Sequence, residues 1–438
     1  MTEEELDELD NEEEEFEDED EDVKPGVREI PKLKKPDQHI TKEQWDKVIK
    51  ANFPDLWPVA EIVLAGITQL LIKDIVNPFG LILVDKPASG KTLTLNFFSG
   101  LDELVFADDN FSPASFVTHA ANRPKKELKK IDLLPKIKDK ALLVREMAPI
   151  FGKHEDQVLG NMSILTRIFD GEGYLSSSGV HSRRGYSGTF MFIFLGASTP
   201  IQPRIWRTMS TLGSRLFFVN VNSKEKDEEA LTDQLLSKPY QQKVEACREA
   251  TNNLIRSMWQ KSPEGVVWDA SKSDREQIKK ITKIAKMLAR FRGNVGIWES
   301  AGAFGPSGKL VHKIPETEQP DRINQILYNL AMANALANER DYIDRDDIRL
   351  ILKVALESAP FHRTKVLKFL VKEGGKVDSE QVEKMLGCSR PTAIKEMEFL
   401  AVLGIAYKIT DPGGTEIYLE KPFRWLLAAG KKYPDLFE

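Results

Sequence analysis

Residues 79–101 read Phe-Gly-Leu-Ile-Leu-Val-Asp-Lys-Pro-Ala-Ser-Gly-Lys-Thr-Leu-Thr-Leu-Asn-Phe-Phe-Ser-Gly-Leu, and the rest of the chain is organised around them. The apolar run 81–84 predicts a short buried strand, and the apolar spacing after Gly90 predicts a helix. The turn between them, residues 85–92, matches the phosphate-binding pattern G-x-x-x-x-G-K-[ST] except at its first position, where Asp85 stands. The sequence therefore predicts a phosphate-binding loop; an ordinary turn rich in small residues is the alternative.

This loop combines the groups that bind a nucleoside triphosphate. Gly90 allows the backbone to approach an anion closely, and the amide groups that open the helix face the phosphates. Lys91 reaches the β and γ oxygens, and the Thr92 hydroxyl is a ligand for Mg²⁺. We therefore expect ATP and Mg²⁺ as cofactors, with ATP held by Pro87, Ala88, Ser89, Gly90, Lys91 and Thr92.

Composition indicates a cytoplasmic protein of several domains. The 438 residues are 41% hydrophobic, which is enough for about three domains, each with its own core. The longest apolar stretch, residues 58–72, contains Glu61, so we expect a buried helix rather than a membrane span. Cys247 and Cys388 stand far apart, which favours a reducing compartment and argues against structural zinc. Association with the nucleoid is left open.

Charge is distributed unevenly along the chain. Residues 1–22 contain sixteen Asp or Glu and no Lys or Arg, which leaves 52 acidic and 62 basic residues over 23–438, a net charge of +10. An acidic block with so little apolar content cannot fold alone, so residues 1–40 are expected to form an acidic tail and a linker. The tail either serves solubility alone or contacts a protein partner or basic surface, in competition with nucleic acid.

Residues 41–225 are expected to form the nucleotide-binding domain. A helix is predicted over 59–75. Further strands are predicted at 103–107, 141–144, 190–195 and 216–221. Strands that alternate with helical segments predict an α/β fold whose mostly parallel sheet is covered by helices on both faces.

Two polar residues follow these strands, at the carboxyl ends where ligands of such sheets lie. Glu146 is the carboxylate that a phosphate-loop ATPase needs to hold the Mg²⁺ shell or to polarise the attacking water. Thr199 is placed to hydrogen-bond the γ-phosphate or that water. Either residue alone could be a surface polar group; together with the phosphate-binding loop they predict a catalytic site, with Thr92 and Glu146 as the Mg²⁺ ligands.

Two basic stretches interrupt the predicted sheet. Residues 123–140 contain eight Lys or Arg against three acidic residues, and residues 173–188 predict a hairpin. A lysine-rich loop is often only a solvated surface, which is the alternative here. We expect nucleic-acid contacts from Lys125, Lys126, His181, Arg183 and Arg184.

The remainder of the chain predicts a helical region and a small C-terminal domain. Residues 226–357 predict an all-α lid with helices at 226–237, 241–259, 273–291, 322–338 and 344–358. Residues 293–318 are loop-like, and we assign them no role.

Residues 358–438 predict a winged helix-turn-helix. Asp378 with Gln381 caps a short helix that ends at Gly387, and the next helix leaves Arg390 and Lys395 pointing outward. A wing hairpin is predicted at 405–410 and 415–419. Such domains bind DNA in the major groove, with a pure protein-contact module as the alternative.

The order of these features resembles the AAA+ ATPases of the minichromosome-maintenance and MoxR type. Residues 177–200, Ser-Ser-Gly-Val-His-Ser-Arg-Arg-Gly-Tyr-Ser-Gly-Thr-Phe-Met-Phe-Ile-Phe-Leu-Gly-Ala-Ser-Thr-Pro, are similar to that family's hairpin and sensor strand, and 212–221 resemble its leucine-serine-arginine-phenylalanine stretch. The resemblance implies a phosphate-loop AAA+ core and assembly into a ring, a hexamer or similar. It also implies that Arg215 is the arginine finger, that Thr199 replaces the sensor-one asparagine and that Arg322 is sensor two.

The chain departs from that family in two places. Arg145 and Glu146 stand where the family has aspartate and glutamate, so Glu146 must serve alone and hydrolysis is expected to be weak or unusual. The N-terminal domain of the replicative helicases is not expected. Two functions remain: an ATP-driven motor or remodeller acting on DNA or a nucleoprotein complex, or a nucleotide-responsive DNA-binding regulator or protein adaptor with little ATP turnover.

Overall fold

The computed structural model describes residues 28–108, 112–120, 124–179, 182–212, 215–221, 227–236, 239–302, 305–312, 314–412 and 414–438. The expected acidic tail, residues 1–22, and His181 lie outside these ranges. Along the described part of the chain, no helix is both long and apolar enough to cross a membrane.

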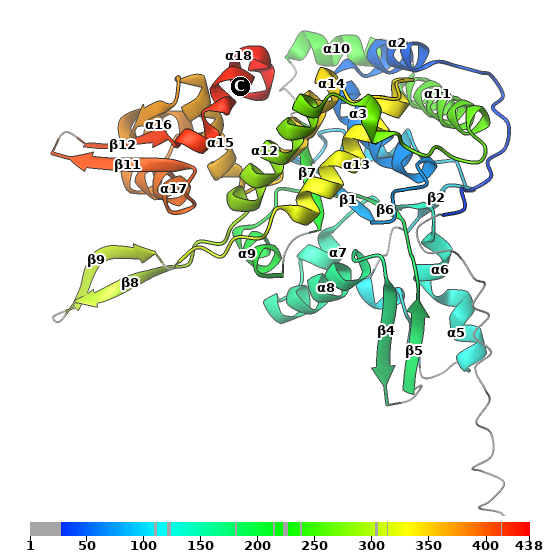
Figure 1. The fold of residues 1–438 in the computed structure, drawn as a ribbon, viewed down its shortest axis with the longest axis horizontal. Coiled ribbons are helices and arrows are strands. Elements are labelled where there is room, and N and C mark those ends of the chain that lie inside the picture. The colour runs from blue at the N-terminus through cyan, green and yellow to red at the C-terminus, as the bar shows by residue number, and fades with distance from the viewer. Residues whose placement is uncertain are drawn as a thin grey trace, which may run out of the picture.

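A five-stranded parallel sheet forms the centre of the molecule (Figure 1). Its spatial order is β2-β3-β6-β1-β7. The strands are β1 (Phe79–Val84), β2 (Val105–Ala107), β3 (Ala141–Val144), β6 (Ile193–Ser198) and β7 (Leu216–Asn220). Every residue of β1, β3 and β6 is buried, as in parallel strands that are covered on both faces. The α/β class with a parallel sheet, expected from the sequence, is confirmed.

Alternate residues of β1 point into two separate apolar clusters. Leu81 and Leu83 belong to one cluster, and Ile82 and Val84 to the other, because successive side chains of a strand face opposite sides. The first cluster is covered by α3 (Trp57–Thr68), α2 (Lys42–Asn52), α4 (Lys91–Asn96) and the later helices. The second cluster is covered by α6 (Leu133–Ile137), α7 (Ala148–Phe151), α8 (Glu155–Ile168) and α9 (Pro203–Leu212).

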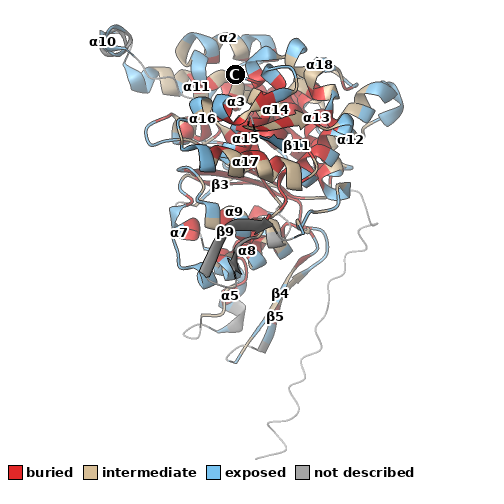
Figure 2. Cartoon of the chain, turned by 90° about the vertical axis from the view of Figure 1, so that its left-hand side faces the viewer, coloured by how far each residue is buried: buried red, intermediate tan, exposed pale blue. Residues whose placement is uncertain are grey.

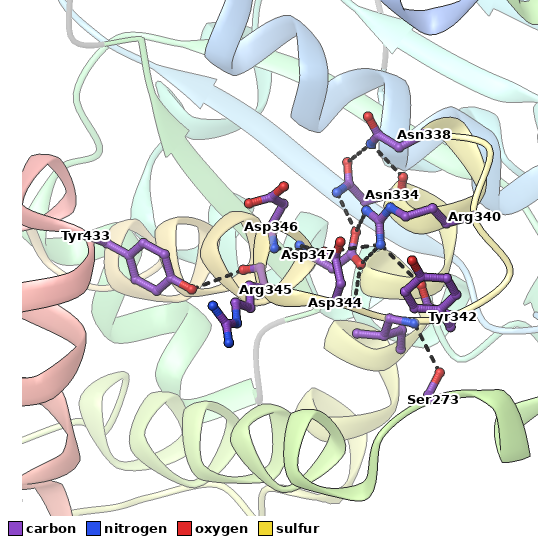
Figure 3. A network of polar contacts seen from close by, with 11 residues as sticks. Ser273, Asn334, Asn338, Arg340, Tyr342, Asp344, Arg345, Asp346, Asp347 and Tyr433 are labelled. Atoms are coloured by element: carbon purple, nitrogen blue, oxygen red, sulfur yellow. Dashed lines mark hydrogen bonds and ion pairs between the residues drawn. The ribbon is translucent and has the colours of Figure 1, made fainter.

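The helical region after β7 packs over the sheet. It comprises α10 (Glu228–Leu236), α11 (Tyr240–Lys261), α12 (Arg275–Phe291), α13 (Asp321–Ala337) and α14 (Arg345–Glu357). A buried polar network joins α13 to α14 (Figure 3). The fully buried Asp347 carboxylate accepts hydrogen bonds from Arg340 Nη1 at 2.7 Å, from Arg340 Nη2 at 2.9 Å and from Asn334 Nδ2 at 2.7 Å. Because its partners satisfy the carboxylate, the network fixes the two helices in one arrangement.

Two antiparallel hairpins extend from this body (Figures 1 and 2). One consists of β4 (Gly173–Ser178) and β5 (Ser182–Ser187), which follow α5 (Lys125–Ile131) and the helices up to α8 in the chain. The other consists of β8 (Ile297–Gly302) and β9 (Gly305–His312). The expectations of a loop over 293–318 and of an all-α region over 226–357 are therefore wrong. The glycines and proline of this hairpin concealed the pairing, which the backbone bridge between Asn294 and Glu316 closes at the base with N···O distances of 2.9 and 3.0 Å.

The C-terminal unit contains three helices, a three-stranded antiparallel sheet and a final helix. The helices are α15 (Phe361–Lys372), α16 (Ser379–Leu386), α17 (Arg390–Val402) and α18 (Trp425–Lys432). The sheet has the order β10-β12-β11, made of β10 (Lys376–Asp378), β11 (Ala406–Asp411) and β12 (Gly414–Leu419). Asp378 caps α16 together with Gln381, and Gly387 ends it at φ +63°, as expected from the sequence.

Candidate functional site

The phosphate-loop sequence lies at the carboxyl end of β1, in the middle of the sheet. Residues 85–90 connect β1 to α4, and Gly90 takes φ +94° at the start of that helix. Only glycine adopts this backbone conformation without strain. A Cβ atom on Gly90 would also lie 2.7 Å from Leu56 Cδ2, so a side chain is excluded there on two grounds.

Lys91 lies across this loop and is 8% exposed. Its Nζ donates to the Lys86 carbonyl at 2.7 Å, to the Asp85 carbonyl at 2.8 Å and to Ser89 Oγ at 3.3 Å. Burial lowers the pKa of the Lys91 ammonium, and the charges of Asp85 and Glu146 oppose that shift. Because these oxygens accept hydrogen bonds from the ammonium, they fix the position of Lys91 on the loop.

The structure brings Glu146 and Thr199 to the same end of the sheet as Lys91, where the carboxyl ends of the parallel strands lie. Strand β6 lies between β3 and β1, with Val84 opposite Ser198 and Val144 opposite Gly196. Thr199 follows β6 directly and is exposed. Glu146 is also exposed, and its Oε1 accepts a hydrogen bond from the Ala148 amide at 2.9 Å. The carboxylate therefore has a fixed position beside the Lys91 charge.

The oxygen groups at this edge fit Mg²⁺. Thr92 is exposed on the first turn of α4, and Glu146 supplies one carboxylate. Mg²⁺ is usually held by one or two carboxylates together with substrate phosphates, rather than by an all-protein cage. The described residues contain no group of three or more His, Cys, Asp or Glu that could hold a metal ion.

Arg145, the residue before Glu146, turns toward α4. Its Nε donates to Asn96 Oδ1 at 3.0 Å. The residue is half-buried and carries a positive charge, so it cannot order a Mg²⁺ hydration shell. The carboxylates that act on the Lys91 charge here are those of Asp85 and Glu146.

A cavity of about 420 Å³ between the sheet domain and the helical region was not predicted from the sequence. Trp57, Pro58, Glu61 and Ile62 of α3 line one side, and Asn334, Asn338, Asp346, Arg349, Leu350 and Lys353 line the other. Trp57 directly follows Leu56, the residue that packs against Gly90, but the residues that line the cavity include none of the phosphate loop. Its residues come from three helices far apart in the chain, and their spacing gives no signal in a single sequence.

Arg215 and Arg322 lie together, away from the phosphate loop. Arg215 precedes β7, whose residue Leu216 is opposite Gly80 near the start of β1, whereas the loop follows the other end of β1. Oδ1 of Asp170 accepts hydrogen bonds from Arg322 Nη1 at 2.6 Å and from Arg215 Nη2 at 3.1 Å. Burial acts to raise the pKa of Asp170, but the two arginines outweigh it and hold that pKa below its ordinary value. The sequence analysis did not identify Asp170.

The β4–β5 hairpin corrects one expectation. Arg183 is exposed, as a phosphate contact requires, but Arg184 is 7% exposed and forms an ion pair with the fully buried Asp132 at 2.6 Å. Asp132 also accepts from Tyr186 Oη at 2.8 Å and from the Thr118 amide at 2.7 Å. Arg184 therefore anchors the hairpin and cannot contact nucleic acid as predicted.

Other residues predicted to contact nucleic acid lie on separate elements. The backbone of Lys125 and Lys126 opens α5, but the described structure does not include their side chains. Arg390 is exposed at the start of α17. Lys395, one turn later, is half-buried, with Nζ 5.9 Å from the centre of the Phe399 ring.

Comparison of the chain with protein-family models and with curated proteins finds no match to either. Any assignment of function therefore rests on the arrangement of the residues in the structure.

Proposed function

We propose that the chain is an ATP-hydrolysing AAA+ subunit that works in a ring and acts on DNA or a nucleoprotein complex. The observation that carries this proposal is that the two halves of the site lie at opposite ends of the parallel strands. Lys91, Glu146 and Thr199 follow the carboxyl ends of the strands, while Arg215 and Arg322 lie at the amino end of β7. A subunit arranged in this way completes its site only with the arginines of a second copy.

Each residue has a distinct task in this proposal. Bound ATP and Mg²⁺ supply the phosphoryl group and the charge that neutralises it. Lys91 and the loop amides bind the phosphates. Glu146 orients the attacking water and accepts its proton, and the Thr199 hydroxyl donates to the same region. Arg215 and Arg322 of the neighbouring copy stabilise the negative charge that develops on the phosphoryl oxygens.

The C-terminal unit supports a DNA-directed role. Its α16 and α17, followed by the β11–β12 hairpin, have the order of a winged helix-turn-helix, with Arg390 exposed at the start of α17. The N-terminal residues of such a helix contact base edges and phosphates in the major groove. The β4–β5 hairpin, which bears the exposed Arg183, supplies a second basic element.

Arg145 favours a second candidate function, a nucleotide-responsive regulator or adaptor with little turnover. A guanidinium stands where an aspartate would order Mg²⁺, and this weakens hydrolysis without affecting binding by Lys91. The two candidates share the nucleotide site and differ only in whether ATP is consumed.

ATP binding and steady-state hydrolysis, each measured with and without DNA, test the proposal. Lys91→Ala should weaken ATP binding by about 1.5–3 kcal/mol, or about ten- to hundred-fold. Glu146→Gln should bind ATP normally and lose hydrolysis. Lys153→Ala, an exposed lysine between α7 and α8, is the matched control and should change neither. Unaltered ATP binding by Lys91→Ala would refute the site, and binding without turnover by the wild type would favour the regulator.

A further inference from the structure

Arg292 is a buried arginine beside the Arg215–Arg322 pair, and the proposed function gives it no task. It follows α12 and is 4% exposed. Its Nη2 donates to the Leu216 carbonyl at 2.8 Å and its Nε to the Ser358 carbonyl at 3.0 Å, while the guanidinium lies 4.4 Å from the centre of the Phe217 ring. Because Leu216 directly follows Arg215, these contacts fix the backbone from which the Arg215 side chain projects.

Arg292 also faces Glu318, whose carboxylate interacts electrostatically with both Arg215 and Arg322. Arg292 Nη1 lies 3.7 Å from Glu318 Oε1. Burial raises the pKa of Glu318, and the positive charges of Arg292, Arg215 and Arg322 oppose that shift. Glu318 therefore lies within electrostatic reach of all three guanidinium groups.

The position of Arg292 is itself fixed by two other elements. Ser210 Oγ of α9 donates to the Arg292 carbonyl at 2.8 Å. From α15, Arg363 Nη1 donates to the Phe291 carbonyl at 2.6 Å and to the Gly293 carbonyl at 3.0 Å. Residues 291–293 are thus held from both sides, which makes them a rigid support rather than a loop that adapts to its surroundings.

We propose that Arg292 and Glu318 are positioning residues that hold Arg215 and Arg322 in the geometry needed by the neighbouring subunit. The inference rests on the proposed function. Two arginines side by side repel each other, and each prefers a separate, fully hydrated position. The carboxylates of Asp170 and Glu318 offset this repulsion, while Arg292 pairs with Glu318 and fixes the start of β7. Misplacement of a catalytic group by about 1 Å can lower a rate by about a hundredfold.

Subunit mixing distinguishes this role from a general structural one. Glu318→Gln keeps the size of the side chain and removes its charge; Arg292→Met removes the guanidinium. Both should lower kcat by about 10- to 100-fold and leave each subunit's own ATP binding unchanged. Arg290→Met is the matched control, because Arg290 lies two residues away, is exposed and donates to the Gly404 carbonyl at 3.3 Å. It should keep wild-type kcat.

In mixtures, Glu318→Gln should regain hydrolysis with Lys91→Ala, whose arginines are intact, and should regain none with Arg215→Ala, which shares the same defect. Light scattering should show that assembly persists in every mixture. Three results would overturn this inference alone. The first is a wild-type kcat in both Glu318→Gln and Arg292→Met. The others are equal recovery of hydrolysis with the two partners, and no recovery with Lys91→Ala in intact assemblies. A wild-type chain that hydrolyses no ATP would overturn the hydrolytic function, and the inference with it.

Discussion

Gly90 and Leu56 are packed so closely that an added Cβ atom on Gly90 would lie 2.7 Å from Leu56 Cδ2. Leu56 is 6% exposed and is fixed by the turn Pro54–Leu56 that precedes α3. The phosphate loop is therefore packed against the segment that precedes α3, and the next residue of that segment, Trp57, lines the 420 Å³ cavity.

Gly90→Ala should damage both stability and nucleotide binding. The substitution places a side chain at φ +94° and against Leu56, at a combined cost of about 1–3 kcal/mol in the free energy of unfolding. Urea unfolding and calorimetric ATP titration measure the two effects. Gly160→Ala is the control, because Gly160 lies in α8 with nothing near its Cβ position, and it should stabilise by about 0.5–1 kcal/mol. Equal stability of the two variants would contradict this account.

Arg184→Met should destabilise the protein through the hairpin anchor. Removing one partner of the buried Arg184–Asp132 pair leaves an uncompensated carboxylate and should cost about 3–5 kcal/mol. A double-mutant cycle with Asp132→Asn, followed by urea unfolding, should show that the two losses are far from additive. Additive losses would mean that the interaction between Arg184 and Asp132 contributes nothing to stability.

Arg183→Ala should change DNA binding without changing stability, since Arg183 is exposed on the neighbouring position of the same strand. Each phosphate that the variant no longer neutralises should reduce the slope of log affinity against log salt by about 0.9 on duplex DNA or about 0.7 on a single strand. Fluorescence anisotropy at several salt concentrations measures this slope. Arg390→Ala, in the C-terminal unit, provides the comparison: it should weaken binding but leave DNA stimulation of hydrolysis at saturating DNA. A slope unchanged by Arg183→Ala would remove the hairpin from the DNA surface.

Cys247 should make the protein sensitive to alkaline pH. Burial in α11 raises the pKa of its thiol to about 12 from an ordinary value of 9.0. The unfolded chain loses this proton first as the pH rises, so the stability contributed by the buried neutral thiol is complete below pH 9 and is lost between pH 9 and about 12. Urea unfolding of wild type and Cys247→Ala from pH 8 to pH 10.5 should show a steeper decline for the wild type. Equal declines in the stability of the two proteins would contradict a raised pKa of Cys247.

Strands and helices were predictable where one local signal dominates. The run 141–144 was predicted with the bounds that β3 has in the structure. By contrast, the strand predicted at 190–195 is observed as β6, Ile193–Ser198, because Phe190, Met191 and Phe192 are buried without belonging to the strand. Apolar content reports burial, and it does not specify which buried residues pair with a neighbouring strand.

The candidate site was predictable only where its residues follow strands. Lys91, Glu146 and Thr199 share an edge because parallel strands end together. Arg184 was misjudged even though it is two residues from Tyr186 on the same face of β5, a spacing that indicates an inward side. Its partner Asp132 is 52 residues away in the chain, and no local pattern connects them. Asp170 was concealed in the same way, because it is 45 residues from Arg215 and 152 residues from Arg322 in the chain.

The backbone bridge between Asn294 and Glu316 makes the β8–β9 segment an appendage with its own closure. The chain leaves and re-enters the body at neighbouring positions, so the number of residues beyond the bridge does not affect how α12 and α13 are joined. Loop-closure entropy changes only slowly with such length. This hairpin is accordingly a segment in which a fluorescent reporter or an affinity epitope could be grafted while the body stays the same.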